Sequence, residues 1–151
     1  MAQVTGKEGT FLAKKIDHIG IAVASLKDAI AQFSVLTGFL PQTETVAAQH
    51  VDVAMFPVGG VRIELLEGTT SESAVAKFIS KRGPGIHHIC FEVEDLDKSK
   101  KVLSEQGLRF IEGVSAEGAS NTRVAFLHPH SMAGILIELV EYPKNNSTES
   151  A

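Results

Sequence analysis

The chain has 151 residues, of which 44% are hydrophobic and 21% are charged, and its net charge is −4. This composition is typical of one globular domain, and it lacks the basic surface that nucleic-acid binding requires. No apolar run approaches the roughly 20 residues that span a bilayer, and the first residues resemble neither a secretion signal nor a transit peptide. Cys90 is the single cysteine, so an internal disulfide is excluded and a reducing, cytoplasmic setting is expected.

The first half of the chain predicts one strand, one helix and three further strands. Residues 16–23 alternate between apolar and other side chains, with β-branched residues on the apolar side, which is typical of a strand. Ser25 resembles a helix N-cap, and Gly38 can end the helix that follows to about residue 37. Three further strands are expected over residues 39–45, 46–57 and 61–66.

A connecting helix is predicted over residues 69–81, where apolar side chains recur at helical spacing and a Gly-Pro-Gly sequence follows. The second half then repeats the order of the first. Its elements are expected to be a strand at 86–93, a helix at 96–106, and strands at 108–112, 122–127 and 135–141.

Two segments of the first half recur in the second. Residues 16–23 (IDHIGIAV) recur as 86–93 (IHHICFEV), and residues 61–67 (VRIELLE) recur as 135–141 (ILIELVE). Self-similarity of this kind indicates a duplicated supersecondary unit. Each copy carries one histidine and one glutamate, which are His18 and Glu64 in the first and His88 and Glu138 in the second.

The alternation of side chains along a strand predicts where these four residues point. Each has the opposite parity to the apolar row of its strand, so the apolar rows should pack under the helices and the four polar groups should meet on the other face. A carboxylate such as Glu138, set between apolar neighbours, is costly to bury without a strong partner. Two imidazoles and two carboxylates suit a divalent transition metal with open coordination positions. His87, of the other parity, is expected at the rim or behind the ligands.

At these residues the sequence resembles the vicinal oxygen chelate superfamily, which is of glyoxalase and dioxygenase type, and within it the methylmalonyl-CoA epimerase family. The most specific matches are IDHIGIAV, GIHHICFEV, FLHPHSMAGILIELVEYP and the helix segment SESAVAKFI. The resemblance implies an α+β fold in which two tandem βαβββ modules form a curved sheet around a shared cleft. The implied boundaries are an extension at 1–14, a domain at 15–144 with modules at about 15–68 and 85–142 joined by a linker helix at 69–82, and a disordered tail at 145–151.

Carried over residue by residue, the resemblance implies a set of site residues. The metal ligands are His18, Glu64, His88 and Glu138, and family members have Gln or Glu at the position of Glu64. One divalent ion is implied, and cobalt, manganese, nickel, iron and zinc all suit such donors. Asn121 and Arg123 match polar positions for binding the CoA substrate.

The activity implied by the resemblance is the interconversion of (R)- and (S)-methylmalonyl-CoA, a step of propionate metabolism, by C2 proton abstraction through a metal-stabilised enolate. The partner is then a small-molecule CoA thioester, with no nucleic acid or membrane, and the protein is a homodimer in the cytoplasm, or in the mitochondrial matrix of a eukaryote. A gap of even ten pKa units between base and carbon acid costs roughly 14 kcal/mol, so the enolate needs stabilisation. Glu138 is one candidate base, and Glu64 or Asp52 can serve the opposite face.

Three other functions fit parts of the pattern. A glyoxalase I-like lactoylglutathione lyase shares the ligand types and the enolate chemistry, but the C-terminal block favours the epimerase. An extradiol dioxygenase would bind ferrous iron with two His and one Glu, which leaves Glu64 without a role. A non-catalytic small-molecule-binding module of the same fold needs a hydrophobic, often aromatic cleft and no metal ligands, whereas this chain has no Trp, one Tyr and all four ligand candidates.

Overall fold

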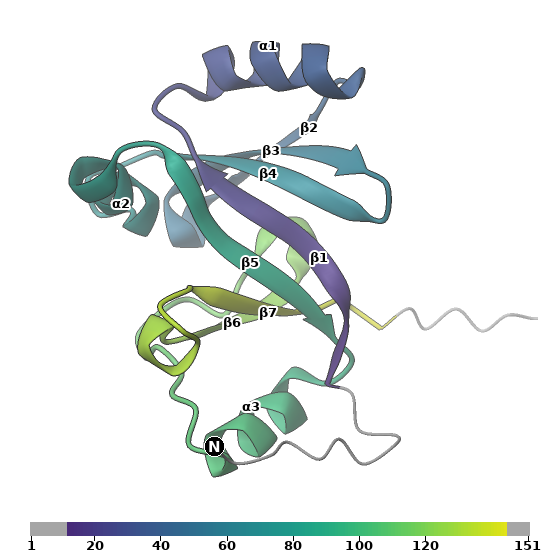
Figure 1. The fold of residues 1–151 in the computed structure, drawn as a ribbon, viewed down its shortest axis with the longest axis vertical. Coiled ribbons are helices and arrows are strands. Elements are labelled where there is room, and N and C mark those ends of the chain that lie inside the picture. The colour runs from purple at the N-terminus through teal and green to yellow at the C-terminus, as the bar shows by residue number, and fades with distance from the viewer. Residues whose placement is uncertain (1–11, 145–151) are drawn as a thin grey trace, which may run out of the picture.

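The computed structural model describes residues 12–144 of the chain. In this part, seven strands form one curled sheet in the order β2-β3-β4-β1-β5-β7-β6, accompanied by three α-helices (Figure 1). The strands are β1 (Ala13–Ala22), β2 (Gln42–Val46), β3 (Val51–Val58), β4 (Val61–Gly68), β5 (Gly85–Val93), β6 (Arg123–Leu127) and β7 (Ile137–Glu141). The helices are α1 (Leu26–Thr37), α2 (Ala74–Arg82) and α3 (Leu96–Glu105). The predicted α+β fold with a shared curved sheet is confirmed.

The two halves of the sheet join at the antiparallel pair of β1 and β5. Beyond this pair, β4 runs parallel to β1, and β7 runs parallel to β5 in the equivalent place. Strands β2 and β3 extend the first half, and β6 extends the second. The strands that carry the two repeated sequence segments therefore lie side by side at the centre of the sheet.

Several predicted boundaries differ from the structure. The expected strand at 46–57 is interrupted by a 3-10 turn at Ala47–Gln49, after which His50 adopts a left-handed conformation. The expected strand at 108–112 was wrong in extent: Phe110 makes a single bridge to β6, and the chain then turns at a glycine with positive φ. The connecting helix begins at Ala74 rather than at residue 69, because the Ser73 hydroxyl caps it. The predicted extension and tail lie largely or wholly in residues 1–11 and 145–151, outside the described residues.

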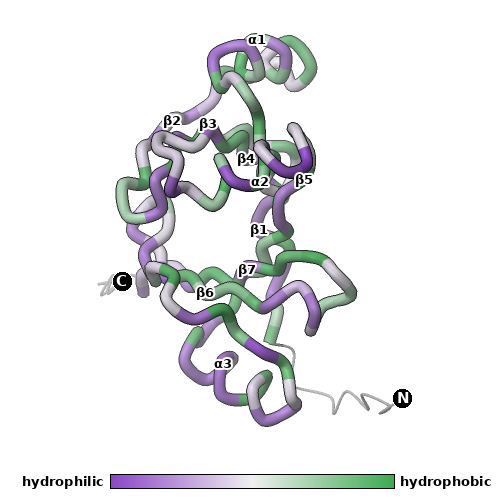
Figure 2. Tube along the Cα trace, turned by 90° about the vertical axis from the view of Figure 1, so that its left-hand side faces the viewer, coloured by the Kyte–Doolittle hydropathy of each residue, from purple (hydrophilic) through white to green (hydrophobic). Residues whose placement is uncertain are grey.

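Helices α1 and α3 cover the outer face of the sheet at opposite ends of the molecule, as Figures 1 and 2 both show. Under α1, the apolar row of β1 and β4 packs with fully buried Phe56 and Leu65. Under α3, the apolar row of β5 and β7 packs with Leu96 and Leu103. Each such side chain contributes roughly 1.5–3 kcal/mol through burial. The apolar rows thus lie under the helices as predicted, and the other face of each strand is turned inward.

No helix among the described residues is long and apolar enough to cross a membrane.

Candidate metal centre

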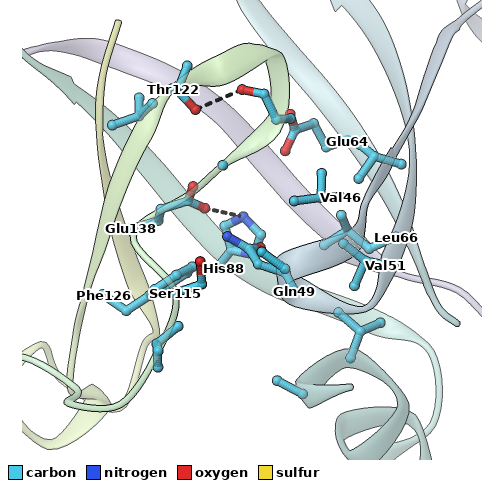
Figure 3. A pocket seen from close by; sticks show the side chains of 18 of the residues that line it. Val46, Gln49, Val51, Glu64, Leu66, His88, Ser115, Thr122, Phe126 and Glu138 are labelled. Atoms are coloured by element: carbon cyan, nitrogen blue, oxygen red, sulfur yellow. Dashed lines mark hydrogen bonds and ion pairs between the residues drawn. The ribbon is translucent and has the colours of Figure 1, made fainter. Parts of the chain in front are cut away.

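Four side chains from the central strands converge on the inner face of the sheet. His18 of β1 has its Nε2 atom 2.8 Å from Glu64 Oε2 of β4 and 3.1 Å from His88 Nε2 of β5. Glu138 Oε2 of β7 lies 2.9 Å from His88 Nε2 and 3.5 Å from His18 Nε2. All four residues are buried, with exposed fractions of 4–7%. The sequence prediction that these four side chains meet is confirmed, and Figure 3 shows Glu138 joined to His88.

The register of the sheet brings these donors together around one small residue. Gly20 of β1 pairs with His88 across β5 and with Glu64 across β4. A Cβ atom on Gly20 would lie 2.2 Å from Cε1 of the His88 ring, so only glycine leaves room for that ring. In the second half, Cys90 takes the same place between the other two donors. The sequence analysis missed Gly20, although an isolated glycine inside a strand is a sign of close approach.

Two β-bulges turn one further residue of each half onto this inner face. The β1–β5 register shifts by one residue at Asp17, between Ile16 and His18 of β1. It shifts again at His87, between Ile86 and His88 of β5. A bulge places an extra residue in one strand and redirects its side chain. Asp17 Oδ2 consequently lies 2.6 Å from His18 Nδ1, and His87 Nδ1 lies 2.9 Å from His88 Nδ1. His87 therefore sits behind a donor histidine, one of the two places expected for it.

The electrostatics of the cluster favour a positive charge at its centre. Burial alone lowers the pKa of His18, but its hydrogen bonds, foremost the one with Asp17, raise that pKa far above its ordinary value. Burial raises the pKa of Glu138, but the charge of His88 and the hydrogen bonds with both histidines lower it to about 2. The Glu138 carboxylate is thus favoured in its ionised form, which stabilises a cation lying beside it and the imidazoles.

The donor set fits a divalent transition metal. Bonds of about 2.1 Å place neighbouring ligands of a tetrahedral or octahedral ion about 3.0–3.4 Å apart. His18 Nε2 lies 2.8–3.5 Å from the other three donors, and His88 Nε2 lies 2.9 Å from Glu138, which is close to that range. Two carboxylates neutralise a dication, and imidazole with carboxylate is a donor combination that such ions accept. The cluster therefore meets the requirements of a metal centre in donor type, charge and spacing.

The four donors lie in a cavity of about 320 Å³ between the two halves. One wall is apolar and comes from the first half, with Val46, Val51 and Leu66 facing the donors (Figure 3). The opposite wall includes Phe126 and the segment around Ser115. A cavity of this size holds a small ligand, and its apolar wall keeps water away from the donors.

The Glyoxalase/Bleomycin resistance protein/Dioxygenase superfamily model matches residues 17–126, which include three of the four donors. The chain belongs to this superfamily. Among its relatives, the Ethylmalonyl-CoA/methylmalonyl-CoA epimerase of Cereibacter sphaeroides is 37% identical over 130 residues, which cover 83% of this chain and 96% of that protein. The uncharacterized protein YqjC of Bacillus subtilis is 42% identical over 134 residues, covering 87% and 94%.

A solved structure shows the similarity of the fold. A variant of the Streptomyces coelicolor methylmalonyl-CoA epimerase, in complex with 2-nitronate-propionyl-CoA, superposes with a TM-score of 0.82 and is 34% identical. The match covers 87% of this chain and 99% of that chain. Both the sequence and the fold therefore agree with proteins named as epimerases over nearly their whole length.

Not every residue predicted for the superfamily site lies in the cavity. Asp52 points to the other face of β3, where its Oδ1 atom accepts a hydrogen bond of 2.6 Å from Thr45. Its neighbours Val51 and Val53 face the cavity instead. The structure does not bring Asp52 to the donors, because alternation along β3 turns it outward.

The two residues predicted for CoA binding also lie outside the cavity. Arg123 is half-exposed and pairs with Asp97 of α3 at 3.0 Å and with Glu141 at 3.7 Å. Asn121 lies in a turn with positive φ and does not line the cavity, whereas the next residue, Thr122, does. The offset is one residue: Thr122 lines the cavity, whereas the side chain of Arg123 reaches Asp97 of α3 on the helix side.

Arg62 and Tyr142 belong to the cavity wall and were missed by the sequence analysis. Arg62 is the sole Lys or Arg among the described residues that line the cavity. Alternation could have found both, because Arg62 lies two positions before Glu64 and Tyr142 four positions after Glu138, on the same face. Both side chains donate hydrogen bonds to Asp17. Alternation along β1 could not have placed Asp17 in the cavity, because a bulge turns its side chain inward.

Proposed function

We propose that the protein is a metal-dependent epimerase that interconverts (R)- and (S)-methylmalonyl-CoA. The observation that carries the proposal is the convergence of two imidazoles and two carboxylates in one cavity, in a chain whose relatives are named for this activity. His18, Glu64, His88 and Glu138 would hold the metal. A divalent cation bound there supplies Lewis-acid stabilisation of the negative charge that develops on the thioester oxygen.

Glu138 and Glu64 are the proposed pair of bases. They come from equivalent positions in opposite halves of the sheet, so they can approach C2 of a substrate from opposite sides. One carboxylate takes the C2 proton and keeps it, and the other, already protonated, delivers its own proton to the opposite face of C2. The position of Asp52 outside the cavity supports Glu64 over Asp52 as the partner of Glu138.

The remaining cavity residues provide the environment for this proton transfer. The apolar wall of β2, β3 and β4 excludes water and strengthens electrostatic interactions at the donors. Arg123 is already paired with two carboxylates, so no contact with CoA is proposed for it. The proposed protein is a cytoplasmic homodimer, as the family resemblance implies. Sedimentation velocity tests the number of chains in the assembly.

Exchange of the C2 proton in heavy water tests the function. Each pure epimer of methylmalonyl-CoA is incubated with metal-loaded protein and with protein treated with a chelator, and deuterium at C2 is followed by NMR. Metal-dependent exchange with interconversion of the epimers is expected. An absence of metal-dependent exchange would contradict the proposal, and turnover of the glutathione hemithioacetal instead would favour the lyase alternative.

Two variants assign the bases in the same assay. Glu138→Gln and Glu64→Gln should each abolish epimerisation, while each retains slow exchange from one epimer only, and from opposite ones. The metal content of both variants is measured in parallel, because both side chains are also proposed ligands. Equal loss of exchange from both epimers in metal-loaded Glu64→Gln would remove Glu64 as a base specific to one face.

A further inference from the structure

We propose that Asp17 is the positioning residue of the metal centre, which fixes the ring of His18 so that its Nε2 atom faces the cation. The inference rests on the proposed metal centre but not on the identity of the substrate. Asp17 is 4% exposed, and its Oδ2 atom accepts a hydrogen bond of 2.6 Å from His18 Nδ1. Because Nδ1 is engaged by Asp17, Nε2 is the nitrogen of His18 left to bind a cation, and it lies among the other donors.

Asp17 is itself held from two further sides. Arg62 Nη2 donates to its Oδ2 atom at 2.7 Å, and the Tyr142 hydroxyl donates to its Oδ1 atom at 2.6 Å. Arg62 also donates to the Tyr142 hydroxyl. These contacts neutralise a buried carboxylate and fix both of its oxygens, so that it cannot rotate away from His18. A carboxylate serving only as an ion-pair partner of Arg62 would not need the additional contacts with His18 and Tyr142.

The second half of the sheet repeats this arrangement with different chemistry. A bulge equivalent to that of Asp17 places His87 with its Nδ1 atom 2.9 Å from Nδ1 of His88. His87 is held by an edge contact with the ring of Phe78, with the two ring centroids 5.0 Å apart. Both donor imidazoles therefore have a partner on the nitrogen that faces away from the cluster. The two halves differ in that the partner of His18 is a carboxylate held by two further hydrogen bonds, whereas the partner of His88 is an imidazole.

Metal affinity tests the inference independently of catalysis. Binding of Co²⁺ or Zn²⁺ is measured by competition with a chromophoric chelator, and the d–d absorption of bound Co²⁺ reports the ligand field. Asp17→Asn keeps the shape of the side chain and removes its charge, and we expect 10–100-fold weaker binding with an altered Co²⁺ spectrum. Tyr142→Phe frees one oxygen of Asp17 without touching His18, so a smaller loss of affinity in the same direction is expected.

Glu72→Gln is the matched control. Glu72 lines the same cavity, but its side chain is 78% exposed and pairs only loosely with Lys77 at 4.0 Å. Its substitution removes the same charge from the cavity, so an unchanged affinity is expected. An equal loss of metal affinity in Glu72→Gln and Asp17→Asn would mean that only the net charge of the cavity matters, and it would overturn the inference. If Asp17→Asn and Tyr142→Phe both fold and keep the affinity and the Co²⁺ spectrum of the unmodified protein, the inference is also overturned. If the unmodified protein itself binds no divalent ion, the proposed metal centre is overturned as well.

Discussion

Gly20→Ala is expected to abolish binding at the proposed metal centre while leaving the fold intact. The added Cβ would lie 2.2, 2.5 and 2.7 Å from Cε1, Nδ1 and Nε2 of His88. Restoring an ordinary contact of about 3.4 Å requires the ring to move by roughly 1 Å. Metal-ligand bonds tolerate deviations of only about 0.2 Å, so a displaced His88 ceases to be a ligand. Changes behind a ligand typically cost 10–100-fold in affinity, and loss of the ligand itself should cost about 100-fold or more.

The fold should survive this substitution because the three atoms nearest the new methyl all belong to the His88 side chain, which can shift. Gly85→Ala is the matched control: Gly85 also lies in the sheet, and a Cβ atom there would meet nothing within 4 Å. Metal affinity by calorimetric titration and thermal unfolding of the metal-free protein are measured for both variants. Wild-type affinity in a folded Gly20→Ala protein would refute the argument that close packing against Gly20 positions His88.

Four further predictions follow from the structure. Saturating divalent metal, at about 100 times its dissociation constant, should stabilise the protein by about 2.7 kcal/mol, seen as a rise of several degrees in Tm that a chelator reverses; an unchanged Tm would argue against binding to the folded state. Phe56→Ala, at a fully buried position under α1, should destabilise by about 3–5 kcal/mol in urea unfolding, whereas Val35→Ala, 87% exposed, should change stability by less than about 0.5 kcal/mol. Asp95→Ala removes the carboxylate that accepts a hydrogen bond from Lys98 N at the start of α3 and should cost about 1 kcal/mol in the same assay. Asp52→Asn should retain C2 proton exchange, because Asp52 faces away from the cavity; a loss in a folded, metal-loaded variant would return Asp52 to the mechanism.

The sequence was sufficient for those parts of the site that depend on alternation within a strand. Duplication of the His and Glu segments located the four donors, and parity placed them opposite the apolar rows that α1 and α3 cover. The same rule, applied two positions before Glu64 and four after Glu138, would also have found Arg62 and Tyr142. Alternation succeeds for Arg62, Glu64 and Glu138 because β4 and β7 pair with their neighbours without a register shift.

The features that alternation alone does not determine depend on pairing between strands or on the exact end of a strand. Asp17 and His87 reach the inner face through bulges, and a bulge exists only relative to the partner strand. Asp52 and Arg123 are each one residue away from a side chain that faces the cavity, and an offset of one reverses the face in a strand. The segment at 108–112 has strand-like residues but forms a single bridge.

Anomalous diffraction from crystals grown with Mn²⁺ or Co²⁺ tests the central claim most directly. One strong peak is expected about 2.0–2.3 Å from Nε2 of both His18 and His88 and from a carboxylate oxygen of both Glu64 and Glu138. The account would be contradicted by an anomalous peak elsewhere on the molecule. It would also be contradicted if, in metal-loaded crystals, His18 and His88 did not bind the same ion.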